Sequence, residues 1–245
     1  MKILFTISAF MLLGIAKLSA TTVNPDSLKQ QVAVTSDSLK APLYTQIAGT
    51  YLNYDTISSK RKRYIYQENA IGYTLQAIHY YSRYNDTTGL RLSFDNLAKV
   101  YRSEKKFSQA KWFILQSNTL SRAKNDVPNI ISSLLELALI KTDIKDYRLA
   151  MRDLNEALTL SSTNHFPKTE ADVQMGYVTL YNNMKLYTKA DIALKRHDAI
   201  NDSILHSQDV KVAVATDSIQ RKKKVYLTSN KRLYKTNSSR RIALL

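Results

Sequence analysis

The stretch KKFSQA, residues 105–110, decides the fold because it returns along the chain at a constant interval. Forty residues later the sequence reads KDYRLA, and forty residues after that it reads KLYTKA. Each copy has an aromatic residue three positions before an alanine, and Ala70, Ala110, Ala150 and Ala190 share the same spacing. Self-similarity at a period between about 20 and 50 residues is typical of repeat proteins.

A second motif precedes each anchor alanine. LAKVY (97–101), LALIK (137–141) and YVTLY (177–181) each begin 13 residues before an anchor. Apolar residues at Phe94, Leu97, Ala98 and Tyr101 follow the i, i+3, i+4, i+7 spacing of an amphipathic helix. Each unit is therefore predicted to be a helix, a short turn and a second helix.

The start of the repeated region is less regular. IAGTY (47–51) echoes LAKVY with an offset of 50 residues. We interpret the extra residues, around DTISSKRKRY (55–64), as a longer turn or an extended helix. Between later units lie NDTTG (85–89), KNDVPN (124–129) and SSTNHFPKTE (161–170), which are rich in residues that cap helices and form turns.

The pattern resembles the tetratricopeptide repeat (TPR), whose consensus spans roughly 34 residues. The second unit matches it at Phe94, Leu97, Ala98, Tyr101, Phe107, Ala110 and Ser117. The third matches at Leu134, Leu137, Ala138, Tyr147, Ala150, Leu154 and Ala157. The fourth matches at Tyr177, Val178 and Tyr181, but His197 replaces a small residue. The longer period implies longer helices or loops, and the proline that closes the family's repeat is absent.

The predicted fold class is all-α, an α-solenoid of antiparallel helix pairs (a TPR-like superhelix). Stability in such a fold comes from interfaces between neighbouring units. The expected organisation is a signal peptide at 1–20, an N-terminal linker at 21–40, a repeat domain at 41–205 and a basic C-terminal helix or disordered tail at 206–245. The four units are expected near 41–86, 87–126, 127–166 and 167–205.

The TPR resemblance implies a binding surface. In that family the first helices line the concave side and hold peptides or partner domains. Carried over by position, the partner-binding residues are Leu92, Asp95, Lys99, Arg102, Leu135, Leu139, Met175 and Asn182. Asp95 stands one turn before Lys99 and is expected to orient it. The alternative is that these are ordinary solvated helix positions.

Catalytic and metal-binding motifs are missing from the sequence. It has no Gly-rich phosphate loop, no G-x-S-x-G and no H-E-x-x-H. There are no cysteines, and the four histidines show no i, i+3 or i, i+4 pairing. We therefore expect a protein that is not an enzyme and that uses no cofactor or metal.

The N-terminus has the pattern of a secretory signal peptide. Lys2 precedes an apolar run from Ile3 to Ile15, and LSA (18–20) places small residues at a cleavage site. This run is shorter than the roughly 20 apolar residues of a spanning helix. We expect export to the periplasm or the extracellular space and no transmembrane span in the mature chain.

Positive charge is concentrated at the C-terminus. The formal charge is +16, and the residues from Leu205 onward hold ten Lys/Arg against two Asp, which is +8. The run Arg221, Lys222, Lys223 and Lys224 is a candidate polyanion-binding segment. An acidic partner fits it better than nucleic acid, which an exported protein rarely meets. A solvated tail is the alternative.

Three classes of function follow from these observations. The first is an exported scaffold that binds a peptide or protein on the concave face. The second is a sensory module, because the order of segments also resembles the extracytoplasmic region of Bacteroidetes sensor proteins, either truncated or stand-alone. The third is a polyanion binder that acts through the basic tail. The identity of the partner and the oligomeric state are left open.

Overall fold

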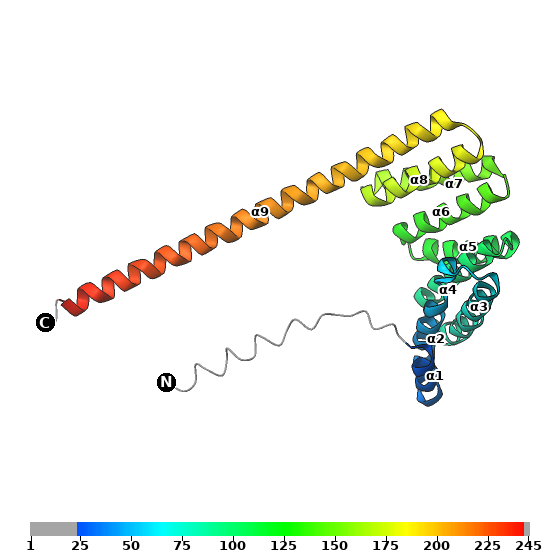
Figure 1. Ribbon diagram of the computed structural model, residues 1–245, viewed down its shortest axis with the longest axis horizontal. Helices are drawn as coiled ribbons and strands as arrows, with labels where there is room; N and C mark the ends of the chain where they lie inside the picture. Colours follow the sequence, from blue (N-terminus) through cyan, green and yellow to red (C-terminus); the bar gives the residue numbers. More distant parts are fainter. Residues whose placement is uncertain (1–23, 243–245) are drawn as a thin grey trace. The chain divides into compact units, whose positions relative to one another are not determined.

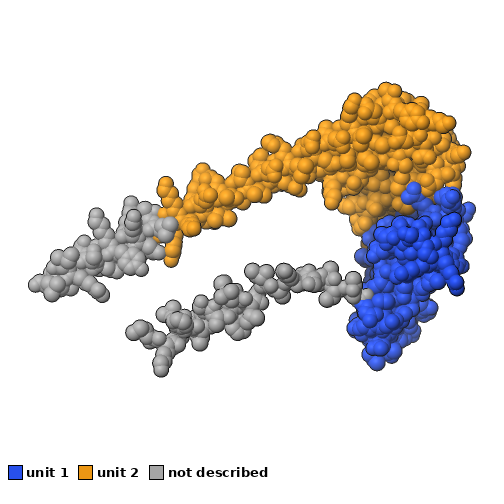
Figure 2. Space-filling model, viewed as in Figure 1, with its two compact units in different colours: residues 1–117 blue, residues 118–245 orange. Residues whose placement is uncertain are grey.

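A computed structural model describes residues 24–242 of the chain (Figure 1). The predicted signal peptide at 1–20 lies outside the described residues. The chain divides into two compact units, residues 1–117 (unit 1) and residues 118–245 (unit 2) (Figure 2).

The described part of the chain is helical and holds no strand, which confirms the all-α prediction. Its elements are α1 Pro25–Val34, α2 Asp37–Tyr51, the 3₁₀ turn η1 Tyr54–Thr56, α3 Lys60–Arg83, α4 Thr87–Ser103, α5 Phe107–Ala123, α6 Val127–Asp143, α7 Tyr147–Thr163, α8 Pro167–Asn183 and α9 Tyr187–Ile242. We call α2, α4, α6 and α8 the first helices, and α3, α5, α7 and α9 the second helices.

Uniform helix lengths explain the 40-residue period. Each helix from α4 to α8 has 17 residues, and three residues separate it from the next helix, so a pair occupies 2 × (17 + 3) = 40 residues. Each turn contains one residue with a positive φ: Asn85, Lys105, Asn125, Lys145, His165 and Lys185. A left-handed residue after a helix lets the next amides reach back to the last carbonyls and reverses the chain.

Aspartates set the start of three helices. Asp86 accepts hydrogen bonds from the backbone amides of Thr88 and Gly89, at 3.0 and 2.9 Å. Asp126 and Asp146 each accept one from the third residue that follows, at 3.3 Å. The carboxylate satisfies amides that the helix leaves without a partner.

The anchor alanines are buried, as close helix packing requires. Ala70, Ala110 and Ala150 have no exposed surface, and Ala190 is 5% exposed. Four residues after Ala150, Leu154 is 1% exposed and lies against Gly176 of α8. The equivalent Leu194 of α9 is 39% exposed, because no further helix follows α9 in residues 24–242 to cover it.

Unit 1 begins with helical structure where the linker at 21–40 was expected. Leu28 and Val32 of α1 pack on Ile47 of α2. The irregular region after Tyr51 contains both expected devices: the η1 turn, and an extended helix, since α3 has 24 residues. Tyrosines then join α2 to α3: the Tyr44 ring lies 6.4 Å from that of Tyr73 and 5.7 Å from that of Tyr80, both stacked.

Unit 2 is built from the end of α5 and from α6 to α9. Its largest buried cluster includes Ile131, Leu134 and Val173, so it draws on both first helices, and Leu154 and Ala193 add the second helices. Beyond the repeats, α9 continues without a break to Ile242 (Figure 1). The segment that begins at residue 206 was expected to be a helix or a disordered tail, and in the structure it is helical as far as Ile242.

Two glycines provide a matched test of the packing in unit 1. A Cβ at Gly89 of α4 would lie 2.3 Å from the Tyr81 ring, whereas one at Gly72 of α3 would meet nothing within 4 Å. Gly89→Ala is therefore expected to destabilise the protein by about 1–3 kcal/mol. Gly72→Ala is expected to stabilise it by about 0.5–1 kcal/mol, since alanine favours a helix. Urea unfolding measures both, and equal shifts of the same sign would contradict the close approach of α3 and α4.

Candidate functional site

Four of the eight predicted partner-binding residues lie on α4 in unit 1. Leu92, Asp95, Lys99 and Arg102 follow one face of this helix, and Leu92 and Lys99 are exposed. Asp95 accepts a hydrogen bond from Arg91, at 2.6 Å, so its direct partner lies one turn before it. Lys99 was expected to be that partner. It lies close enough to act on the charge of Asp95 electrostatically.

Burial raises the pKa of the Asp95 carboxyl above its ordinary value, against the opposing effects of a hydrogen bond from Ser117 and of the charges on Arg91 and Lys99. A carboxylate held at such a cost is more common at functional sites than elsewhere. The cluster places one half-buried anion between two cations on a first helix.

The other four predicted residues lie on neighbouring first helices of unit 2. Leu135 and Leu139 on α6 are half-buried, and Leu135 packs against Gly176 of α8. On α8, Met175 is 38% exposed and Asn182 is exposed. These four residues lie on two helices that contact each other, α6 and α8, and they offer apolar side chains and an amide. We call them the first-helix face of unit 2.

A recurring pair of positions links the first and second helix of each repeat. One is the last residue of the first-helix motif, and the other stands three residues after the anchor alanine. In unit 1 these positions hold aromatic pairs: the rings of Tyr51 and Tyr73 stack at 5.8 Å, and those of Tyr101 and Phe113 stack at 5.4 Å. The side chains fill the space between the two helices.

Unit 2 uses the same two positions differently. In the third repeat they hold Lys141, which donates a hydrogen bond to the carboxylate of Asp153. Both side chains of this ion pair are buried. In the fourth repeat they hold Tyr181 and Ala193. The methyl group of Ala193 lines a pocket beside Tyr181, at the position where the earlier repeats have larger side chains.

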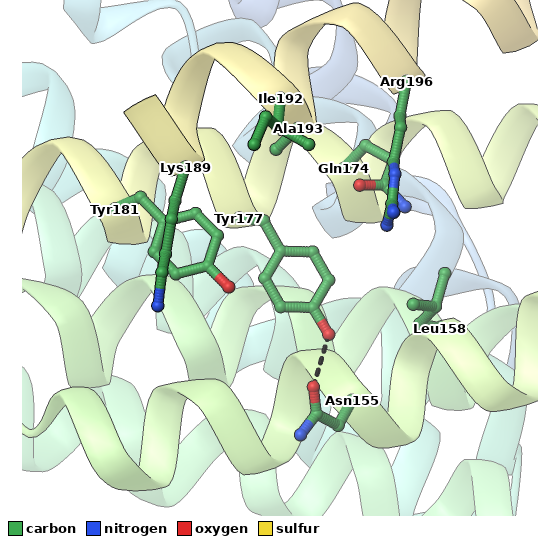
Figure 3. A pocket seen from close by; sticks show the side chains of 9 residues that line it. All are labelled: Asn155, Leu158, Gln174, Tyr177, Tyr181, Lys189, Ile192, Ala193 and Arg196. Carbon is green, nitrogen blue, oxygen red and sulfur yellow. Dashed lines mark hydrogen bonds between the residues drawn. The ribbon is translucent and has the colours of Figure 1, made fainter. Parts of the chain in front are cut away.

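A cavity of about 240 Å³ lies at this last pair (Figure 3). Figure 3 shows Tyr177 at its centre, Tyr181 and Lys189 at one end, and Gln174 and Arg196 at the other. Its walls come from α7, α8 and α9. Met175 and Tyr177 are two positions apart, about 200° around α8, and the cavity residues Gln174 and Tyr181 are each about 100° from the neighbouring Met175 and Asn182. The cavity therefore lies on a different face of α8 from the first-helix face.

Hydrogen bonding holds part of the cavity wall in place. The Tyr177 hydroxyl donates to Oδ1 of Asn155 on α7, at 2.6 Å (Figure 3). Burial raises the pKa of Tyr177 from 10.0 to about 12, with a smaller effect from Tyr181. The phenol therefore stays protonated at neutral pH and remains a donor. In the sequence, Tyr177 and Tyr181 match the repeat pattern, and nothing near them marks a cavity.

The candidate polyanion-binding segment lies on the exposed part of α9. All residues from 205 to 224 are exposed, including Arg221, Lys222, Lys223 and Lys224. Arg221 forms an ion pair with Asp217, at 2.7 Å. Among the described residues, no helix is long and apolar enough to cross a membrane, and no group of three or more acidic or histidine side chains is arranged to hold a metal ion.

Comparisons with known proteins identify the fold of the chain but do not assign it to a family. No protein-family model matches the chain, and no curated protein matches it. Among solved structures, BtubC (BKLC) from P. vanneervenii is similar with a TM-score of 0.58 and 15% identity, over 73% of this chain and 70% of that one. A putative kinesin light chain with nearly identical TPR-like repeats, from Podosopora anserina, has a TM-score of 0.57 and 14% identity, over 74% and 86%.

A third similar structure belongs to a larger protein. It is a Signal Transduction ATPase with Numerous Domains (STAND) with a tetratricopeptide repeat sensor, from Pyrococcus horikoshii, with a TM-score of 0.61 and 18% identity. The similarity covers 74% of this chain and 27% of that protein. Together these likenesses show that the chain has a TPR-like repeat fold, as the sequence predicted.

Proposed function

We propose that the protein is a non-catalytic interaction scaffold, exported from the cytoplasm, that binds a peptide or protein through its first helices. Proteins with TPR-like folds commonly act as interaction scaffolds. The proposal of export is supported by the signal-peptide pattern at residues 1–20.

The observation that carries this proposal is the composition of the first-helix face of unit 2. Leu135, Leu139 and Met175 present apolar surface that is partly open to solvent, and Asn182 adds a side-chain amide. Apolar anchors bury side chains of a partner, while an amide matches the donors and acceptors of an extended peptide backbone. In unit 1, the cluster around Asp95 supplies the charges that select among partners.

A sensory role is the second candidate, and α9 is the observation that favours it. The same helix contributes to the packing of the fourth repeat, through Ala190 and Ala193, and continues to Ile242. A continuous helix that begins in the packing of a repeat and extends beyond it is able to transmit a change in that packing along its length. The third candidate, polyanion binding, is supported by the exposed run Arg221–Lys224.

A peptide-selection experiment separates these candidates. Peptides are selected from a random library on the immobilised protein, and their dissociation constants are measured for two variants. Met175→Asp with Asn182→Asp changes exposed positions of the first-helix face and should leave folding intact. Lys222→Glu with Lys223→Glu reverses charges on the exposed part of α9 and serves as the matched control. Thermal melts by circular dichroism establish that both variants fold.

The scaffold proposal expects the first variant to weaken binding about tenfold or more, because interface anchors contribute more than 1 kcal/mol each. The second variant should bind like the parent. Loss confined to the second variant, with a steep dependence on salt, would transfer the function to the basic segment. If the selected peptides bind both variants as tightly as they bind the parent, the first-helix face is not their binding surface.

A further inference from the structure

The second repeat shows what normally occupies the space where the cavity lies. In that repeat, the Phe113 ring stacks on Tyr101 at 5.4 Å and lies 6.0 Å from the Phe94 ring. These three positions recur at 40-residue intervals, so their counterparts in the fourth repeat are Gln174, Tyr181 and Ala193. Only the tyrosine is kept.

The two substitutions in the fourth repeat create a polar cavity. Ala193 stands where the second repeat has the ring of Phe113, and Tyr181 stacks on the Tyr177 ring instead, at 5.9 Å. Gln174 stands where Phe94 and Leu134 are apolar. Gln174 is 4% exposed, and its side chain lines the cavity (Figure 3). Its amide forms no hydrogen bond with any described residue, yet its polar atoms are not sealed from solvent. The amide is therefore open to the cavity, where it is available to donate a hydrogen bond.

The charge around the cavity has one sign. Lys189 and Arg196 lie two turns apart on α9 and line its two ends. Lys189 lies over the Tyr181 ring, at 5.9 Å, and neither cation forms an ion pair within the described part of the chain. No acidic residue lines the cavity. The neighbouring Lys195, in contrast, pairs with Asp191 at 2.7 Å and lies outside it.

We infer that this cavity binds a small aromatic carboxylate. The ring of the ligand takes the space left beside Ala193 and packs against the wall that the stacked rings of Tyr177 and Tyr181 form. The carboxylate lies between the Arg196 guanidinium and the Gln174 amide, both of which donate hydrogen bonds. Lys189 adds a second positive charge at the other end.

The size of the cavity suits such a ligand. An apolar cavity of about 150 Å³ is sufficient to hold a benzene molecule. The additional space here, in a cavity of about 240 Å³, accommodates a short carboxylate-bearing group. The chemistry is shared by a free aryl acid and by the C-terminal aromatic residue of a peptide. This site uses none of the residues of the first-helix face, which lies on a different face of α8.

Titration calorimetry with four probes tests the inference. Phenylacetate represents the free acid, and N-acetylphenylalanine represents a peptide C-terminus. Benzyl alcohol and N-acetylphenylalaninamide keep the ring but lack the carboxylate. We expect saturable binding of one or both acids, with the uncharged probes weaker by about tenfold or more, because a hydrogen bond to a charged group contributes about 1.5–3 kcal/mol. The acid that binds more tightly identifies the source of the ligand.

Three variants and a control locate the binding site. Ala193→Phe restores the side chain of the second repeat and should abolish binding by filling the cavity. Gln174→Leu restores the residue of the third repeat, and Arg196→Gln removes an exposed charge; each should weaken acid binding about tenfold. Lys195→Gln, on the same helix but outside the cavity, should stay within about twofold of the parent.

Thermal melts accompany each titration, so that loss of binding is distinguished from loss of folding. Arg196→Gln keeps the inference testable even if a core substitution fails to fold, since Arg196 is exposed. The inference is overturned if neither acid binds saturably, if benzyl alcohol binds as tightly as phenylacetate, or if folded Ala193→Phe binds like the parent. An equal effect of Arg196→Gln and Lys195→Gln would also overturn it, because the charge would then act without the cavity.

Discussion

Replacing Asp153 by alanine is expected to lower the free energy of unfolding by about 3–5 kcal/mol, the largest effect of any single substitution considered for this protein. Its carboxylate accepts a hydrogen bond from Lys141, and the two side chains are only 3% and 7% exposed. Arg152 lies 3.5 Å away on the other oxygen but is largely solvated. Removing the carboxylate therefore leaves the Lys141 ammonium buried without its partner.

The matched control for this substitution removes both charges. Lys141→Met combined with Asp153→Val should have a stability near that of the parent or above it, since apolar residues avoid the cost of removing two ions from water. Urea unfolding measures both variants, with the slope m checked for constancy. If the double variant were as unstable as Asp153→Ala, the cost would lie in the shape of the site and not in an unpaired charge.

Leu154→Ala is expected to have the second-largest effect, a loss of about 2–5 kcal/mol. The Leu154 side chain is 1% exposed and packs against α8, where a Cβ on Gly176 would approach its Cδ2 to 2.6 Å. Truncation leaves a cavity between two helices that cannot close completely.

Leu194→Ala supplies the internal comparison, because the two leucines occupy the same repeat position 40 residues apart. Leu194 is 39% exposed, so its truncation should cost about 1 kcal/mol or less. Thermal and urea unfolding measure the pair side by side. Similar losses at the two positions would mean that Leu194 is covered in solution by a surface absent from residues 24–242.

The repeat architecture was predictable because the residues that helix packing and helix capping require recur together in one short pattern. An alanine where helices meet, an aromatic residue three positions earlier and a capping residue between helices recur in phase, and Ala110 and Ala150 are buried. The origin of the period was not predictable. It depends on left-handed residues such as Lys105 and His165, which are neither glycine nor asparagine and carry no turn signal.

The candidate site was predictable only in part. Positions on the first helices follow from helical geometry, so Leu139 and Met175 lie on neighbouring helices as the resemblance implied. The cavity was not predictable because it arises where two residues, Gln174 and Ala193, depart from the repeat pattern. The sequence does not show that these two positions lie close together. The stacked rings of Tyr101 and Phe113 in the second repeat show which side chains occupy the corresponding space.

The length of α9 has a mechanical consequence. The helix that lines the cavity with Lys189, Ala193 and Arg196 also bears the basic segment, with no break between them. From Ala193 to Ile242 a straight helix extends about 74 Å, so a tilt of about 5° at the cavity displaces its far end by about 6 Å. The helix acts as a lever that magnifies a small adjustment against α8 into a displacement that another molecule can detect.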